Sequence, residues 1–225
     1  MRFYFSARTR LGLALLFASL ASASLFGVGA WRSNTLDYVY MNWNLLLAWA
    51  PLLFGLWLVR ILKHNLWSSW RALLVSALWL GFLPNSFYMI TDFIHLSEFS
   101  PDEVVFSTVM LSSFIFTGVS LGYISLYTVH RELLQRMSAR VSAVVIGAVL
   151  LLSSFAIYLG RELRWNTWDI LANPGGILID VSDRLLHPSQ YPEMFAVTYG
   201  FFVLLTSLYV VVWFAARVLR NQKSI

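Results

Sequence analysis

Six long stretches of the chain carry almost no charged residue, and this feature restricts the fold more than any other. The chain has 225 residues, of which 59% are hydrophobic and only 12% charged, whereas a soluble domain carries roughly 25% charged residues. A helix needs about 20 apolar residues to cross a bilayer, and backbone groups in lipid must be hydrogen-bonded within the protein. The sequence therefore predicts an all-α, polytopic membrane protein with a single domain over residues 1–225. Its six predicted transmembrane helices are residues 11–30, 45–62, 72–90, 104–126, 141–159 and 195–216.

The basic residues are concentrated in alternate gaps between these stretches. The N-terminal tail, the second gap, the fourth gap and the C-terminal tail each hold three Lys or Arg residues. The other gaps together hold only Arg32, Arg161, Arg164 and Arg184. Because cytoplasmic loops carry an excess of Lys and Arg, both termini are predicted to lie in the cytoplasm. The net charge of +5 then reflects topology in a lipid bilayer, and we expect no nucleic-acid partner.

The first apolar stretch also has features of a cleavable signal peptide. An arginine-rich flank precedes it, and Ala21, Ser22 and Ala23 resemble a cleavage site. The stretch continues to Ala30, which favours an uncleaved membrane anchor. Cleavage would leave five spans and would not change the orientation of the rest.

A polar segment lies within the third stretch and beyond it. Pro84 removes a backbone donor and predicts a kink or a break in the helix. The polar residues that follow are spaced three, four and three apart, which places them on one face of an α-helix. Ionisable residues close to a membrane tend to face the protein interior or water. The residues of this face are Asn85, Tyr88, Asp92 and His95.

Two interpretations of this face stay open. In the first, it forms an outward-facing polar site, where Asp92 orients His95 and His95 acts as a general base or a metal ligand. In the second, the helix simply reaches the membrane interface. Tyr88 then lies among the headgroups, and Asp92 and His95 are solvated or paired with arginines. An Asp-x-x-His pair identifies no metal, because zinc sites use three or four protein ligands, so the metal and any cofactor are unassigned.

A second polar segment, residues 160–169, follows the fifth stretch and emerges on the same predicted side. If the helix continues through this segment, Glu162, Asn166 and Asp169 share one face. If Gly160 ends the helix, that face does not form.

Two arginines of this segment also have two interpretations. Arg161 and Arg164 supply bidentate donors for a carboxylate or a phosphate, which suits the binding of an anionic headgroup or substrate. They equally suit ion pairs with nearby acids, which would lock two helices together. Removing one partner of such a pair would destabilise the protein strongly, since a buried charge would stay unpaired.

The last outer loop contains a predicted amphipathic helix around residues 177–186. Leu178, Val181 and Leu185 are spaced three and four apart, while acidic residues fall mostly elsewhere. This pattern is typical of a short helix at a membrane interface. A passive surface helix is the favoured interpretation, and a lid over the polar site is the alternative. His187, at its end, is a distant candidate for a third metal ligand.

Both polar segments resemble signatures of a known family. The first signature reads roughly Phe-Leu-Pro-Asn-Ala-Pro-Tyr, two aliphatic residues, Thr-Asp, two further residues and His-Leu. Residues 82–96 match it, with Ser86 and Phe87 in place of Ala-Pro. The second reads roughly Gly-Arg-Phe-Leu-Arg-Trp-Asn-Ser-Trp-Asp, and residues 160–169 match it, with Glu162 in place of Phe. The chain therefore resembles the uncharacterised bacterial integral-membrane family called domain of unknown function 1361, over most of its helical region.

The resemblance implies a multi-pass protein of a bacterial cytoplasmic membrane, and it supplies no substrate. The leading hypothesis is a polar pocket at the outer leaflet that binds, and in its stronger form processes, an anionic or lipid-linked small molecule. The second is a small-molecule transporter, since a proline within a span resembles the broken helices of transport sites. The third is a non-catalytic scaffold or partner subunit, whose polar motifs only hold helices together. The catalytic candidates are His95 and Asp92, and the binding candidates are Arg161, Arg164, Asn85, Tyr88, Asn166 and Asp169.

Overall fold

The computed structural model describes residues 7–221, and over these residues every element of regular secondary structure is helical. Six helices are long and apolar enough to span a membrane, as the sequence predicts. Arg2 and Lys223, two of the basic residues in the charge pattern, lie outside the described residues. The spanning helices are α1 (Ala7–Ser33), α2 (Tyr40–Leu62), α3 (Trp70–Tyr88), α4 (Val104–Leu133), α5 (Ala139–Glu162) and α8 (Pro192–Asn221).

Four short elements lie between these spans. A 3₁₀ helix, η1 (Met89–Glu98), continues directly from α3. After α5 come α6 (Asp169–Ala172), α7 (Pro174–Leu186) and the 3₁₀ turn η2 (Pro188–Gln190). The predicted helix of the last outer loop is thus confirmed as α7. Asn173 caps it by accepting a hydrogen bond from the backbone of Gly176 at 3.0 Å, and a proline occupies its first turn.

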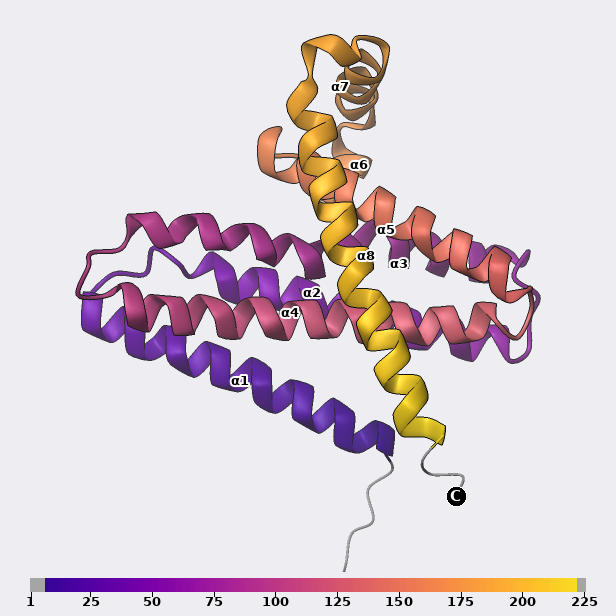
Figure 1. Ribbon diagram of the computed structural model, residues 1–225, viewed down its shortest axis with the longest axis horizontal. Helices are drawn as coiled ribbons and strands as arrows, with labels where there is room; N and C mark the ends of the chain where they lie inside the picture. The colour runs from indigo at the N-terminus through magenta and orange to yellow at the C-terminus, as the bar shows by residue number, and fades with distance from the viewer. Residues whose placement is uncertain (1–6, 222–225) are drawn as a thin grey trace, which may run out of the picture.

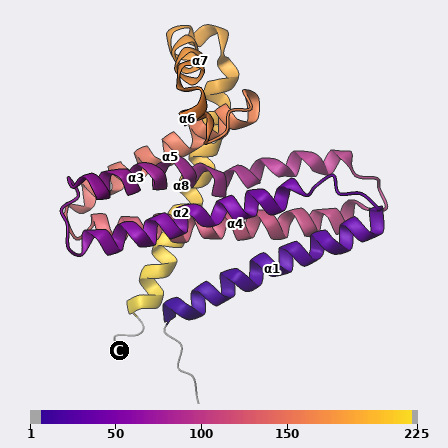
Figure 2. The same ribbon diagram turned by 180° about the vertical axis from the view of Figure 1, so that it is seen from behind.

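The helices α1 to α4 run along the length of the molecule, and α8 crosses them obliquely (Figures 1 and 2). The links α2–α3 and α4–α5 lie together at one end of this bundle (Figure 1). These are the two internal links in which the sequence concentrates Lys and Arg. The fold therefore gathers the basic residues of these two links at one end of the bundle. Near the start of α8, α6 and α7 lie beyond the rest of the bundle (Figure 1).

The core lies where α2, α3, α4 and α5 meet. Leu58, Leu83, Leu126 and Ile157 come from these four helices, and each is fully buried. The approach of α3 to α4 is especially close at Gly122, where a Cβ atom would lie 2.8 Å from Ser86 Cβ. This close packing fixes the position of the end of α3, from which the candidate site begins.

Prolines inside the spans do not break them. The helix α3 continues past Pro84 to its last residue, Tyr88, so no break occurs at the proline. In α2, which contains Pro51, side chains satisfy backbone carbonyls from outside the helix. Ser125 Oγ donates to Pro51 O at 2.7 Å, and Ser86 Oγ donates to Ala48 O at 3.1 Å. These two serines, from α4 and α3, thus tie the turn around Pro51 to its neighbouring helices.

Candidate functional site

The candidate site begins where α3 changes from α-helical to 3₁₀ geometry. The 3₁₀ helix η1 is ten residues long, although such helices rarely exceed three or four residues. With three residues per turn, positions i and i+3 eclipse one another. Asp92, His95 and Glu98 therefore form one row. The prediction of a continuous α-helical face through Asn85 and His95 did not anticipate this change of geometry, which brings Glu98 into the site.

Asp92 is the most unusual residue of the row. Its side chain is 1% exposed, and its Oδ2 atom has no hydrogen-bond partner among the described residues. Asn44 of α2 approaches the carboxylate, which also interacts electrostatically with His95 and Arg161. A buried polar atom without a partner is rare and destabilising. The environment of Asp92 therefore lowers the stability of the folded protein.

Glu98, and not Asp92, orients His95. His95 Nδ1 lies 2.8 Å from Glu98 Oε1, and Tyr38 donates its hydroxyl to Glu98 Oε2 at 3.1 Å. The prediction that Asp92 orients His95 is therefore corrected, because the 3₁₀ spacing offers Glu98 to the ring. An ionised carboxylate only accepts hydrogen bonds, so Nδ1 of a neutral ring carries the proton and Nε2 is the basic nitrogen.

Tyr38 is held as a hydrogen-bond donor at this position. It precedes α2 and lies outside the spanning helices. Burial and the hydrogen bond to Glu98 raise the pKa of Tyr38 to about 12. Its hydroxyl therefore stays protonated at neutral pH and continues to donate to Glu98.

The second polar segment is a turn rather than a helical extension. Helix α5 ends at Glu162, and Arg164 adopts a left-handed conformation with φ of 59°. The backbone N–H of Asn166 then donates to Asp169 Oδ2 at 2.6 Å, which closes the turn before α6. The predicted shared face of Glu162, Asn166 and Asp169 does not form, because a left-handed residue ends the α-helix.

A cavity of about 390 Å³ lies between the two polar segments. This volume is within the range of small-molecule sites. Arg164 and Asp169, which the sequence also suggested as binding residues, do not line it, because the turn separates them from Arg161. The predicted residues that line the cavity are Asn85, Tyr88, Asp92, His95, Arg161 and Asn166.

Helix α2 also contributes to this cavity, which the two polar motifs did not predict. Tyr40, Trp43 and Asn44 lie in the first turns of α2 and line the cavity opposite the two motifs. The two asparagines at the start of an otherwise apolar span, at positions 42 and 44, were the signal that could have indicated them. Aromatic rings form much of the wall, contributed by Tyr40, Trp43, Tyr88, Trp165 and Trp168.

Arg161 has no ion pair in this cavity. No Asp or Glu oxygen of the described residues lies within 4.0 Å of its guanidinium, and no hydrogen bond from it is found there. Arg161 still interacts through space with Asp92 and Glu98. The interpretation in which Arg161 locks two helices by a direct ion pair is therefore not observed. The cavity holds a cation and an anion that do not neutralise each other by contact.

Uncharged contacts join the two motifs instead. Asn85 Nδ2 donates to Thr167 Oγ1 at 3.1 Å and to Phe82 O at 3.1 Å. The ring of Tyr88 packs on Gly160, where a Cβ atom would lie 3.1 Å from ring carbon Cε2. Gly160 thus permits a close approach between α3 and α5 beside the cavity.

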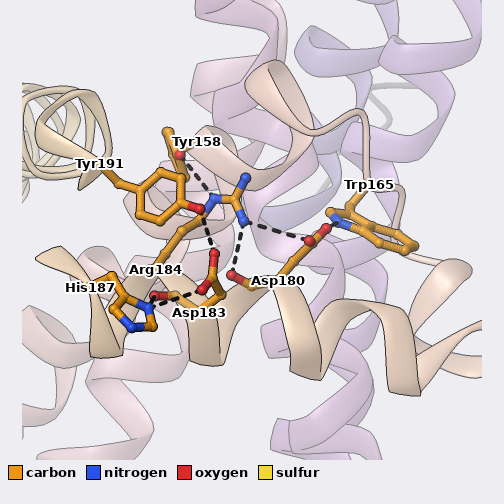
Figure 3. A network of polar contacts seen from close by, with 7 residues as sticks. All are labelled: Tyr158, Trp165, Asp180, Asp183, Arg184, His187 and Tyr191. Carbon is orange, nitrogen blue, oxygen red and sulfur yellow. Dashed lines mark hydrogen bonds and ion pairs between the residues drawn. The ribbon is translucent and has the colours of Figure 1, made fainter.

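A polar network joins residues of α7 to Tyr158 and Trp165, as Figure 3 shows. Arg184 donates through Nε to the Tyr158 hydroxyl at 3.2 Å and pairs with Asp180 Oδ1 at 3.5 Å. Trp165, which lines the cavity, donates through Nε1 to Asp180 Oδ2 at 2.7 Å. These bonds connect α7 to the end of α5. The loop helix is therefore anchored at the cavity wall.

The same network also includes His187. Its Nδ1 lies 3.0 Å from Asp183 Oδ1, and the Tyr191 hydroxyl donates to Asp183 Oδ2. The hydrogen bond from Tyr191 lowers the pKa of Asp183. His187 is thus engaged within the loop. Over residues 7–221, no group of three or more His, Cys, Asp or Glu side chains is arranged to hold a metal ion.

The fold and the cavity define a class, namely a multi-pass helical membrane protein with a charged, aromatic-walled cavity between its third and fifth spans. Residues 43–207 match the family model described as protein of unknown function (DUF1361), and the chain belongs to this family. The matched region contains both polar motifs and every cavity-lining residue except Tyr40. No curated protein and no solved structure matches the chain.

Proposed function

We propose that this protein binds the anionic group of a small or lipid-linked molecule in the cavity beside Arg161. The observation that carries the proposal is the unpaired guanidinium of Arg161 at the wall of a cavity of about 390 Å³. A guanidinium is always charged and presents a planar set of donors that matches a phosphate or a carboxylate. Asn166 and Thr167 line the same cavity and offer further polar atoms to an anion.

The surroundings of the cavity suit a ligand that reaches it from a membrane. Trp43 and Trp168 line the cavity with their ring centroids 6.3 Å apart, and about half of each side chain is exposed. Tryptophan is enriched at the headgroup level of membranes. In a bacterial cytoplasmic membrane with both termini inside, this end of the bundle faces the outer leaflet. An acyl or polyprenyl chain would then remain in lipid while its headgroup enters the cavity.

A catalytic step, if the ligand is processed, would use the oriented imidazole of His95. Its Nδ1 is engaged by Glu98 at 2.8 Å, so Nε2 is the nitrogen that can accept a proton. Asp92 would not orient the His95 ring, and its part in binding would come from its buried carboxylate. The continuity of α3 through Pro84 removes the broken helix on which the transport hypothesis depended.

The test uses the full chain in phosphatidylcholine nanodiscs and measures binding of glycerol phosphate by isothermal titration calorimetry. Arg161→Ala is expected to weaken binding about 10- to 100-fold, since a hydrogen-bonded charged contact contributes roughly 1.5–3 kcal/mol. Arg164→Ala is the matched control, because Arg164 lies three residues away and does not line the cavity. Equal affinities for wild type and Arg161→Ala would contradict the proposal, as would the absence of binding to the wild type.

A further inference from the structure

Two residues that line the cavity each carry a buried polar atom without a hydrogen-bond partner among the described residues. One is Oδ2 of Asp92, whose side chain is 1% exposed, and the other is the hydroxyl oxygen of Tyr40. Both residues line the cavity, from η1 and from the first turn of α2. They come from different elements and line the same cavity, so their lack of partners is a property of the site.

The neighbouring donors of the described residues are not available to Asp92 Oδ2. His95 directs Nδ1 to Glu98 at 2.8 Å, and the Arg161 guanidinium lies beyond 4.0 Å. Asn44 approaches the carboxylate, yet Oδ2 still has no partner. The complementary group for this oxygen is therefore a donor that enters the cavity with a ligand.

The chemistry of that donor follows from what surrounds it. A primary ammonium has three N–H donors, which suits two unsatisfied oxygens. It is also attracted to the faces of aromatic rings, and Tyr40, Trp43 and Tyr88 line this cavity. A metal ion is a poorer match, because no group of three His, Cys, Asp or Glu side chains is arranged around the cavity in residues 7–221.

The two charges of the cavity then select a ligand that carries both signs. An anion alone would satisfy Arg161 and leave the carboxylate of Asp92 unpaired and repelled. A cation alone would do the reverse. We propose that the cavity recognises a zwitterionic headgroup, in which a primary ammonium contacts Asp92 and Tyr40 while a phosphate contacts Arg161. This inference rests on the proposed function and specifies its ligand class.

The experiment compares ligands that differ in one charged group. The full chain in phosphatidylcholine nanodiscs is titrated with phosphoethanolamine, glycerol phosphate and phosphocholine. Phosphoethanolamine is expected to bind about 10- to 100-fold more tightly than glycerol phosphate, as for a hydrogen-bonded charged contact. Phosphocholine is expected to lose much of this gain, because its quaternary ammonium has no N–H. Nanodiscs that contain phosphatidylethanolamine separate the sources. If the phosphatidylethanolamine of the nanodisc competes with added phosphoethanolamine, the ligand is the lipid headgroup. If it does not compete, the ligand is the free compound.

Two variants test the residues. Asp92→Asn keeps the shape of the side chain and removes its charge, so the preference for phosphoethanolamine over glycerol phosphate is expected to disappear. Tyr40→Phe is expected to reduce the same preference several-fold, and it provides the test if Asp92→Asn does not fold. Equal wild-type affinities for phosphoethanolamine and glycerol phosphate would overturn the inference and leave the proposed function standing. If the wild-type protein binds neither phosphoethanolamine nor glycerol phosphate, both proposals are overturned.

Discussion

Replacing Asp92 by Asn is expected to stabilise the ligand-free protein, which distinguishes a binding residue from a structural one. Asp92 is 1% exposed, and its Oδ2 has no partner. An unsatisfied buried polar atom costs about 1–3 kcal/mol, and more when it is charged. The amide of Asn has no formal charge and is less costly to bury. The through-space attractions to His95 and Arg161 are lost, and we expect a net gain of about 1 kcal/mol in the free energy of unfolding.

Glu132 provides the matched control for this prediction. It is also buried, at 7% exposed, but Arg136 Nη1 pairs with its Oε1 at 2.7 Å. Glu132→Gln removes the charge from a satisfied pair and is expected to destabilise the protein by about 1–3 kcal/mol. A change of 1 kcal/mol corresponds to roughly 2–4 °C in melting temperature for a chain of this size.

The assay is thermal unfolding in detergent, followed by tryptophan fluorescence, for both variants and the wild type without added ligand. The expected result is a melting temperature that rises slightly for Asp92→Asn and falls for Glu132→Gln. If Asp92→Asn lowers the melting temperature as much as Glu132→Gln does, Asp92 is a structural residue. The reasoning that its unpaired oxygen belongs to a binding site would then be refuted.

Three further predictions concern the packing and the outer loop. Gly122→Ala is expected to cost about 1–3 kcal/mol through overpacking, because its Cβ would lie 2.8 Å from a side-chain carbon of α3, whereas Gly147→Ala has nothing within 4 Å and should be neutral or stabilising. Equal melting temperatures for these two variants would contradict the close packing of α3 and α4. Ser125→Ala is expected to cost about 2–4 kcal/mol, because Ser125 donates to a carbonyl of α2 and accepts from an indole N–H, both buried. The exposed Ser207→Ala is its control, and a similar loss in both would count against this assignment. Asp183 has a lowered pKa in the folded protein, so its stabilising effect is present above its ordinary pKa of about 3.9 and is lost as the pH falls through the folded value. Asp183→Asn should reduce the acid dependence of the melting temperature below pH 4, and an unchanged profile would refute the role of this carboxylate.

The spanning helices were predictable because their signal is local. Each apolar stretch must be about 20 residues long to cross a bilayer, so length and charge alone locate it. The alternation of basic links was predictable for the same reason, and the fold gathers these links at one end (Figure 1). The membrane orientation itself stays a prediction.

The geometry of the site was less predictable because it depends on tertiary contacts. The motifs located Asp92 and His95, but the change to a 3₁₀ helix replaced Asp92 by Glu98 as the partner of His95. The left-handed conformation of Arg164 separated it from Arg161, although both arginines lie in one motif. The residues of α2 carry no recognisable motif, and they join the cavity because α2 packs against α3.

The proposed binding site is tested most directly by what occupies the space between Arg161 and Asp92. An experimental structure of the full chain in nanodiscs, determined with phosphoethanolamine present, tests this point. We expect density in the cavity that contacts the Arg161 guanidinium on one side and the Asp92 carboxylate on the other. An Arg161 side chain paired directly with Asp92, with no ligand density between them, would contradict it.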